Sequence, residues 1–312
     1  MKIFKIVAVF LLVLFLFLEL IAFSSGSKIQ LDKPLVSVST FSLYDITQHI
    51  AGQSIEIVNI LPFGVDPHSF ELTPKIMAKI EKSSLVLYSG AGLEPWIQSI
   101  SFATPPLDMS KSVYLRALET HEHKEEHAHH DDHCSHGTLD PHYWLNFENM
   151  QKMAEVITRE LVIIAPEHKK MYETNRDTYI KMLKKLDTLY TSGLSSCKIQ
   201  SLILNHNSLG YLAQKYHFQI HSLSGLSPEA ESSASDIKRV LEEISETGIR
   251  TIFYESFVNA KVIESIASDS NVEIDVLQPL GNITANEARL NATYESLMLQ
   301  NLSKLKKAML CH

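Results

Sequence analysis

The sequence predicts an α/β protein with two lobes, each a parallel β-sheet flanked by helices. Strand patterns alternate with helical patterns over residues 35–88, and the same alternation restarts at residue 199. Between these stretches, residues 147–189 show a helical periodicity that is too long for a simple crossover connection. These patterns therefore predict two α/β units with helices linking them.

The first unit contains three short apolar runs with strand character, each bounded by turn-forming or polar residues. We expect strands at 35–39, 55–61 and 85–88, with helices at 43–50 and 74–82. Strands separated by helices pair in parallel, so helices should cover both faces of this sheet. We assign residues 28–146 to this N-terminal lobe.

The linking helices are predicted from a single apolar stripe. It is formed by Met150, Met153, Val156, Ile157 and Leu161. A second helical segment follows Pro166, a residue that commonly opens a helix. We assign residues 147–192 to these helices.

The second unit repeats the pattern of the first, and we assign residues 193–312 to this C-terminal lobe. Strands are expected at 199–204, 218–221, 249–254 and 274–277, with helices at 208–216, 235–245 and 260–267. An amphipathic stretch at 286–309 closes the chain.

The N-terminus has the features of a secretory signal peptide. Two lysines precede an apolar run over residues 6–23, and small residues follow at 24–27. We predict that residues 1–27 are removed, which places the mature protein in the periplasm. No cysteine follows the apolar run, so this sequence offers no thiol for a lipid anchor.

Without the signal peptide, 26 basic and 35 acidic side chains remain, a formal charge of −9. This acidic balance argues against a nucleic-acid partner. Three cysteines are too few for a disulfide scaffold; in an exported protein Cys197 and Cys311 could pair, leaving Cys134 as an additional soft ligand.

A histidine-rich tract covers residues 121–136 and holds seven of the 15 histidines, interleaved with acidic residues. Neutral imidazoles and carboxylates in such a run can gather divalent cations in many overlapping geometries. Composition alone also fits a solvated loop that only aids solubility.

Three histidines outside the tract occupy equivalent places in the predicted topology. His68, His142 and His206 are each expected where a strand gives way to a loop or helix, and Pro67 and Pro141 stiffen two of the approaches. Ligands of parallel sheets bind at the carboxyl ends of the strands, so these imidazoles are candidate metal ligands. We interpret the remaining histidines of the helix and strand patterns as structural or surface residues: His49, His168, His217 and His221.

The mature chain resembles the zinc and manganese solute-binding proteins of ABC importers, in particular the ZnuA-like zinc group. The resemblance is carried by residues 67–71 (PHSFE), 90–96 (GAGLEPW), 140–145 (DPHYWL), 205–206 (NH), 225–231 (GLSPEAE) and 279–281 (PLG).

This resemblance implies two lobes joined by a long rigid helix, with the metal in the cleft between them. His68 and His142 would come from the first lobe and His206 from the second, with the tract just before the second ligand. It further implies that a monomer binds Zn²⁺ as its transported ligand and delivers it to an ABC permease in the inner membrane.

The sequence departs from the family pattern at Gln278, where relatives often carry a carboxylate before Pro-Leu-Gly. The fourth ligand could therefore be water, Gln278 or another group. Manganese prefers oxygen-rich sites, so the lost acid favours zinc, although copper also suits three imidazoles. A zinc hydrolase is the alternative of a different class, with Glu71 or Glu255 as general base, and zinc storage without import is a third reading. We expect no enzymatic activity.

Overall fold

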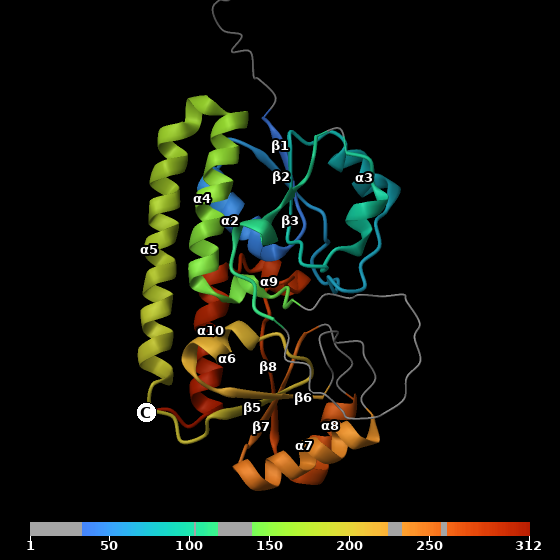
Figure 1. The fold of residues 1–312 in the computed structure, drawn as a ribbon, viewed down its shortest axis with the longest axis vertical. Coiled ribbons are helices and arrows are strands. Elements are labelled where there is room, and N and C mark those ends of the chain that lie inside the picture. Colours follow the sequence, from blue (N-terminus) through green and yellow to red (C-terminus); the bar gives the residue numbers. More distant parts are fainter. Residues whose placement is uncertain (1–32, 103, 118–138, 224–232, 257–260) are drawn as a thin grey trace, which may run out of the picture. The chain divides into compact units, whose positions relative to one another are not determined.

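Two four-stranded parallel sheets organise the chain, as the sequence predicts (Figure 1). The computed structural model describes residues 33–102, 104–117, 139–223, 233–256 and 261–312. Residues 34–312 form one compact unit that contains both sheets. The predicted signal peptide and the histidine-rich tract lie outside the described residues.

The first sheet has the strand order β2-β1-β3-β4, with every pairing parallel. Its elements are β1 (Leu35–Val38), α2 (Phe41–Ala51), β2 (Glu56–Asn59), α3 (Pro74–Ile80), β3 (Leu85–Tyr88), η1 (Pro95–Ser99), β4 (Leu107–Asp108) and η2 (Met109–Ser112). Strand β4 was not predicted, because two residues are too short for a periodic pattern.

The second sheet has the order β6-β5-β7-β8 and is also parallel throughout. Its elements are β5 (Ser201–Leu204), α6 (Gly210–Tyr216), β6 (Gln219–Ser222), α7 (Ala234–Thr247), β7 (Thr251–Tyr254), α8 (Lys261–Ser270), β8 (Glu273–Val276), α9 (Ala285–Arg289) and α10 (Tyr294–Ala308).

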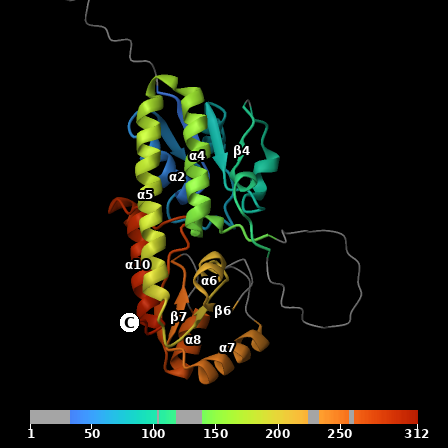
Figure 2. The same ribbon diagram turned by 60° about the vertical axis from the view of Figure 1, so that its left-hand side comes forward.

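Between the sheets lie η3 (Tyr143–Leu145), α4 (Phe147–Ile164), η4 (Pro166–His168) and α5 (Lys169–Leu194). Asn146 begins α4 by accepting hydrogen bonds from two backbone N–H groups of the first turn. Helix α5 contacts α2 and α4 beside the first sheet and α6 and α10 beside the second. Figure 2 shows α5 running alongside α10 (yellow and red).

One apolar core runs through both lobes. Because side chains alternate along a strand, Leu202 and Leu204 of β5 face this core, whereas Ile203 faces a separate cluster with α7 and α8. In the first sheet, Leu85 and Leu87 face the shared core and Val86 packs with α3. The inner faces of both sheets thus share one set of buried side chains with α4, α5 and α10.

The predicted amphipathic stretch at 286–309 is not one continuous helix. The chain breaks after α9, Asn291 adopts a left-handed conformation with φ of 53°, and Thr293 then caps α10. A Thr cap and a residue in the left-handed region together end one helix and begin another, which outweighs the continuous apolar pattern.

The two cysteines that could pair do form a disulfide, Cys197–Cys311. It joins the end of α5 to the end of the chain, where Ile199 N also donates to Met309 O and His312 N to Ser196 O. Among the described residues, no helix has the length and apolar character needed to cross a membrane.

Replacing both Cys197 and Cys311 by serine should lower the free energy of unfolding by about 3 to 5 kcal/mol, because the bridge closes a segment of 114 residues. Urea unfolding under non-reducing conditions measures this. The Cys134→Ser variant is the control, since it removes a thiol outside the bridge. Equal midpoints for the double variant and the wild type would contradict the stabilising role.

Candidate metal centre

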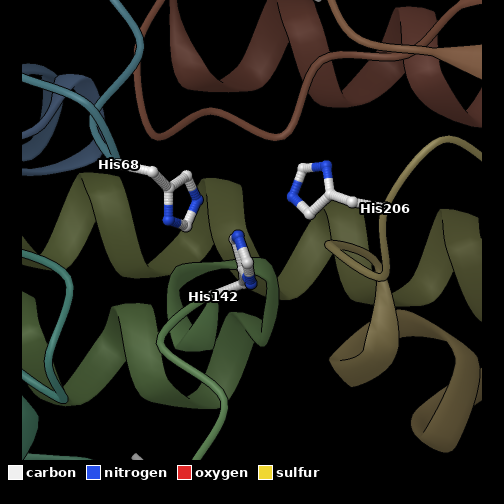
Figure 3. A group of neighbouring side chains, drawn as sticks. All are labelled: His68, His142 and His206. Atoms are coloured by element: carbon white, nitrogen blue, oxygen red, sulfur yellow. The ribbon is translucent and has the colours of Figure 1, made fainter. Parts of the chain in front are cut away.

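Three imidazoles meet between the two sheets. The ring centroids of His68, His142 and His206 are 5.4 to 5.8 Å apart, and one nitrogen of each lies within 4.8 Å of the others. Figure 3 shows one ring nitrogen of each side chain turned toward the same central space. Three ligands at zinc distances of about 2.0 to 2.1 Å would be roughly 3.3 Å apart, so small side-chain rotations would close this set around an ion.

His206 comes from the second lobe, two residues beyond the end of β5, and only 1% of it is exposed. Its Nδ1 lies 3.0 Å from Oε1 of Glu255, which directly follows β7. Its Nε2 is buried and has no hydrogen-bond partner in the described part of the chain. A buried nitrogen acceptor left unpaired is costly, and a bound cation would satisfy it.

His142 is held by the carboxylate of Asp140. Oδ1 of Asp140 accepts from the backbone N–H of His142 at 2.9 Å and lies 2.8 Å from its Nδ1. With Nδ1 as the donor, Nε2 carries the lone pair and is free to bind a metal. The tautomer needed for coordination is thus fixed before any ion arrives.

The Asp140 carboxylate is itself fixed from the other side by Arg116, whose Nη1 donates to Oδ2 at 2.8 Å. Burial raises the pKa of Asp140, but the hydrogen bonds and charges of His142 and Arg116 outweigh it and lower the pKa overall. Asp140 is therefore an anion at neutral pH although it is fully buried.

The second lobe closes over this pair at the start of α6. Tyr211 donates its hydroxyl to Asp140 O at 2.8 Å and accepts from Arg116 N at 3.0 Å. A Cβ at Gly210 would lie 1.6 Å from Arg116 Nη1, so only glycine leaves room for the guanidinium. The position of His142 in the first lobe thus depends on residues of the second.

The prediction that His142 follows a strand was wrong. The residue follows an isolated bridge between Ala117 and Leu139 and immediately precedes η3. The aromatic residues after it fix this segment: the Tyr143 hydroxyl donates to Ser89 O, and Trp144 Nε1 donates to Pro279 O at 2.6 Å. These tertiary hydrogen bonds, and not a preceding strand, therefore fix the position of His142.

His68 lies in the long loop after β2. Asn282, which is completely buried, donates both amide hydrogens to this loop, to Pro62 O and Val65 O at 2.7 Å each. Gly64, with φ of 92°, donates its N–H to Ile283 O. The segment after β8 thereby holds the loop that carries His68.

Burial, together with the neighbouring His142 and His206, lowers the pKa of His68 to about 3. The imidazole therefore stays neutral, with a lone pair available, throughout the physiological pH range. Among the three imidazoles, His68 is the most exposed; His142 and His206 are buried.

A small cavity of about 10 Å³ adjoins the imidazoles of His68 and His142, and its volume is about the room that one water molecule needs. It is lined by Asp66, Pro67, His68, His142, Trp144, Glu255, Pro279, Gly281 and Asn282. The space is large enough for a single ion.

The fourth predicted ligand, Gln278, is not among the residues lining this cavity. Its Nε2 lies 2.7 Å from both carboxylate oxygens of Glu287 and 3.1 Å from the Ser256 hydroxyl. Its Oε1 is buried without a hydrogen-bond partner in the described residues. The structure therefore brings the three histidines together. Gln278 as the fourth ligand stays a prediction.

Sequence reasoning did not identify the residues that hold the ligands. Asp140 was part of a recognised motif and Glu255 was noted only as a possible general base. Asp140 lies beside Nδ1 of His142, and Glu255 lies beside Nδ1 of His206. Asp140 could be found from its proximity in sequence to His142, and Glu255 from its position at the end of a predicted strand.

Two parallel α/β lobes with three converging imidazoles between them define a metal-binding protein of the two-lobe class. The profile of the zinc-uptake complex component A periplasmic family (ZnuA) matches residues 36–308. The chain belongs to this family.

Two curated relatives indicate the range of similarity. The high-affinity zinc uptake system protein ZnuA of Bacillus subtilis is 32% identical over 285 residues, which cover 89% of this chain and 88% of the relative. The zinc-binding lipoprotein AdcA of Streptococcus pneumoniae is 30% identical over 89% of this chain, and the match spans only 56% of that relative.

Solved structures share the fold. The metal-dependent lipoprotein YcdH of Bacillus subtilis has a TM-score of 0.73 at 28% identity, with 89% of this chain and 100% of that chain covered. The Zn(II)-bound ZnuA-like domain of Streptococcus pneumoniae AdcA has a TM-score of 0.73 at 26% identity, with 89% and 99% covered. The predicted fold class and family are confirmed.

The metal-free protein should lose stability as the pH falls below 6.5. The unfolded chain protonates His68 near pH 6.5, whereas the folded protein resists protonation until about pH 3. Stability from this group is thus complete above pH 6.5 and declines toward pH 3, by about 2 kcal/mol at pH 5. Urea unfolding in chelator at pH 7.5 and 5.0 measures the loss, and the His68→Gln variant should show a loss smaller by that amount. The same pH dependence in both proteins would refute the assignment.

Proposed function

We propose that this protein captures Zn²⁺ in the cell envelope and delivers it to an ABC-type permease in the inner membrane for import. The observation that carries the proposal is the convergence of three imidazoles, contributed by both lobes, beside a cavity with room for one ion. Relatives named as zinc uptake and zinc-binding proteins support the same function.

The ligand chemistry favours zinc over manganese. Neutral imidazoles suit zinc, copper and nickel, whereas manganese prefers carboxylate and other oxygen ligands. Zinc takes four ligands in a tetrahedron, so three imidazoles leave one position for water or for Gln278. Copper outranks zinc in intrinsic affinity for such a set, and a direct competition titration separates the two metals.

A hydrolase is the weaker alternative. A zinc enzyme needs room for a substrate and a general base near the metal-bound water. The cavity of about 10 Å³ gives no such room. Glu71 is exposed and does not line the cavity, and Oε1 of Glu255 lies beside Nδ1 of His206. These observations support a binding role without catalysis.

The remaining parts of the proposal concern location and delivery. The signal peptide at 1–27 would export the chain to the periplasm, where it would act as a monomer. The tract at 121–136 would collect zinc close to the site, since it lies between Ala117 and Leu139, which pair with each other just before Asp140 and His142. The three lobe assignments, 28–146, 147–192 and 193–312, belong to the same proposal.

A competitive chelator titration tests the site. The mature protein without residues 121–136 should bind one zinc ion tightly and manganese weakly, because the three converging imidazoles form the site without the tract. Replacing His68 by alanine in this background should weaken zinc binding at least tenfold. Loss of tight binding on deletion of the tract alone would make the tract the main metal site and refute the three-histidine centre.

Growth in chelator separates import from storage. A strain without this protein should fail to grow in low zinc and should recover with the wild-type gene but not with the His206→Ala variant, because that variant lacks the ligand from the second lobe. Growth equal to the parent strain would argue for a zinc-binding protein that does not serve a transporter.

A further inference from the structure

Two of the three imidazoles have a carboxylate at Nδ1, and the two carboxylates differ in how they are satisfied. Asp140 is fully engaged: its Oδ1 serves His142 and its Oδ2 accepts from Arg116. The guanidinium therefore balances its charge. This pair positions a ligand but adds no net negative charge to the site.

Glu255 lies beside Nδ1 of His206 as Asp140 lies beside Nδ1 of His142. Unlike the Asp140 carboxylate, Oε1 of Glu255 has no guanidinium partner among the described residues. This oxygen lies 3.0 Å from Nδ1 of His206, is buried, and has no geometrically satisfactory hydrogen bond among the described residues. Glu255 is 7% exposed and lines the cavity. A buried carboxylate oxygen without a donor is costly unless a cation lies nearby.

The neighbouring side-chain amide of Gln278 cannot compensate the charge of a cation. Gln278 is neutral, and its Nε2 is directed at Glu287 and Ser256. Three imidazoles bring no charge of their own, so a divalent cation would enter with its charge uncompensated by its ligands. Asp66 and Glu255 are the two carboxylates that line the cavity. Glu255 also lies beside Nδ1 of His206, so it can offset part of the charge and orient this imidazole.

We propose that Glu255 is a positioning residue of the metal centre. It holds His206 in the tautomer with the proton on Nδ1, turns Nε2 toward the ion, and offsets part of the ion's charge. The proposal rests on the proposed zinc-binding function. It makes each lobe contribute one carboxylate–imidazole pair: Asp140–His142 from the first and Glu255–His206 from the second.

Two substitutions separate positioning from charge. In Glu255→Gln, an amide oxygen can still accept from Nδ1–H, but the negative charge is gone; in Glu255→Ala, both are lost. Chelator competition on the full mature chain should give zinc affinity reduced about 10- to 100-fold for Glu255→Ala, the usual effect of losing such a partner. Glu255→Gln should fall between this variant and the wild type.

Two spectroscopic measurements distinguish this role from a general effect on folding. Nitrogen NMR of the zinc-loaded wild type should show the His206 proton on Nδ1, and in Glu255→Ala this resonance should broaden or be lost. X-ray absorption at zinc should give the same number of nitrogen neighbours in the wild type and in Glu255→Gln. Loss of an oxygen neighbour in Glu255→Gln would make Glu255 a direct ligand and overturn the positioning role.

Glu243 supplies the matched control, because its Oε1 lies 3.3 Å from Nδ1 of His221, in a pair away from the site. Glu243→Ala should leave zinc affinity unchanged. Zinc affinity of folded Glu255→Ala within twofold of the wild type would overturn this proposal. If His68→Ala is weakened while Glu255→Ala is not, only the role of Glu255 fails; if His68→Ala also binds normally, the proposed function itself fails.

Discussion

The shared apolar core between the sheets is the constraint on which the metal centre depends. Two of the three imidazoles come from the first lobe and one from the second, so any relative movement of the lobes changes the distances between them. The inner faces of β1, β3, β5 and β7 pack into one cluster with α4, α5 and α10. Because protein interiors are close-packed and resist small displacements, this core defines the distances at the site.

The apolar core defines the distances at the site, and polar contacts between the lobes add to it by fixing the orientation of the site residues. The segment after β8 reaches from the second sheet to the first: Pro279 O accepts from Trp144, Leu280 O accepts from the Ser42 hydroxyl, and Asn282 holds the loop of His68. Tyr211 closes over Arg116 and Asp140 from the opposite direction. These buried contacts are directional, so they fix orientation where apolar packing fixes only distance.

The fold was largely predictable because its signals are local. Alternating strands and helices, the stripe on α4 and the restart near residue 199 each occupy a short window of sequence, and the parallel sheets follow from that order. The boundaries that local patterns leave open depend on single residues. Asn291 and Thr293 divide the last helical stretch, and β4 is only two residues long.

The three converging histidines of the candidate site were predictable, and the residues that support them were not. Histidine is rare enough, and its metal chemistry specific enough, that His68, His142 and His206 were recognised in their motifs. Asp140 also lies beside its partner in sequence, within reach of a local motif. Glu255 and His206 are separated by α6, β6, α7 and β7, so no short window of sequence contains both.

The sequence by itself thus determined the class of fold, the three candidate imidazoles and the acidic character of the chain. Only the tertiary structure decided which nitrogen of His142 and His206 lies beside a carboxylate, that Gln278 lies against Glu287, and that one ion-sized space remains. The physical reason is the separation in sequence over which each interaction acts. Hydrophobic periodicity and capping act within a few residues, whereas hydrogen bonds, desolvation and cavity volume arise between atoms that only folding brings together.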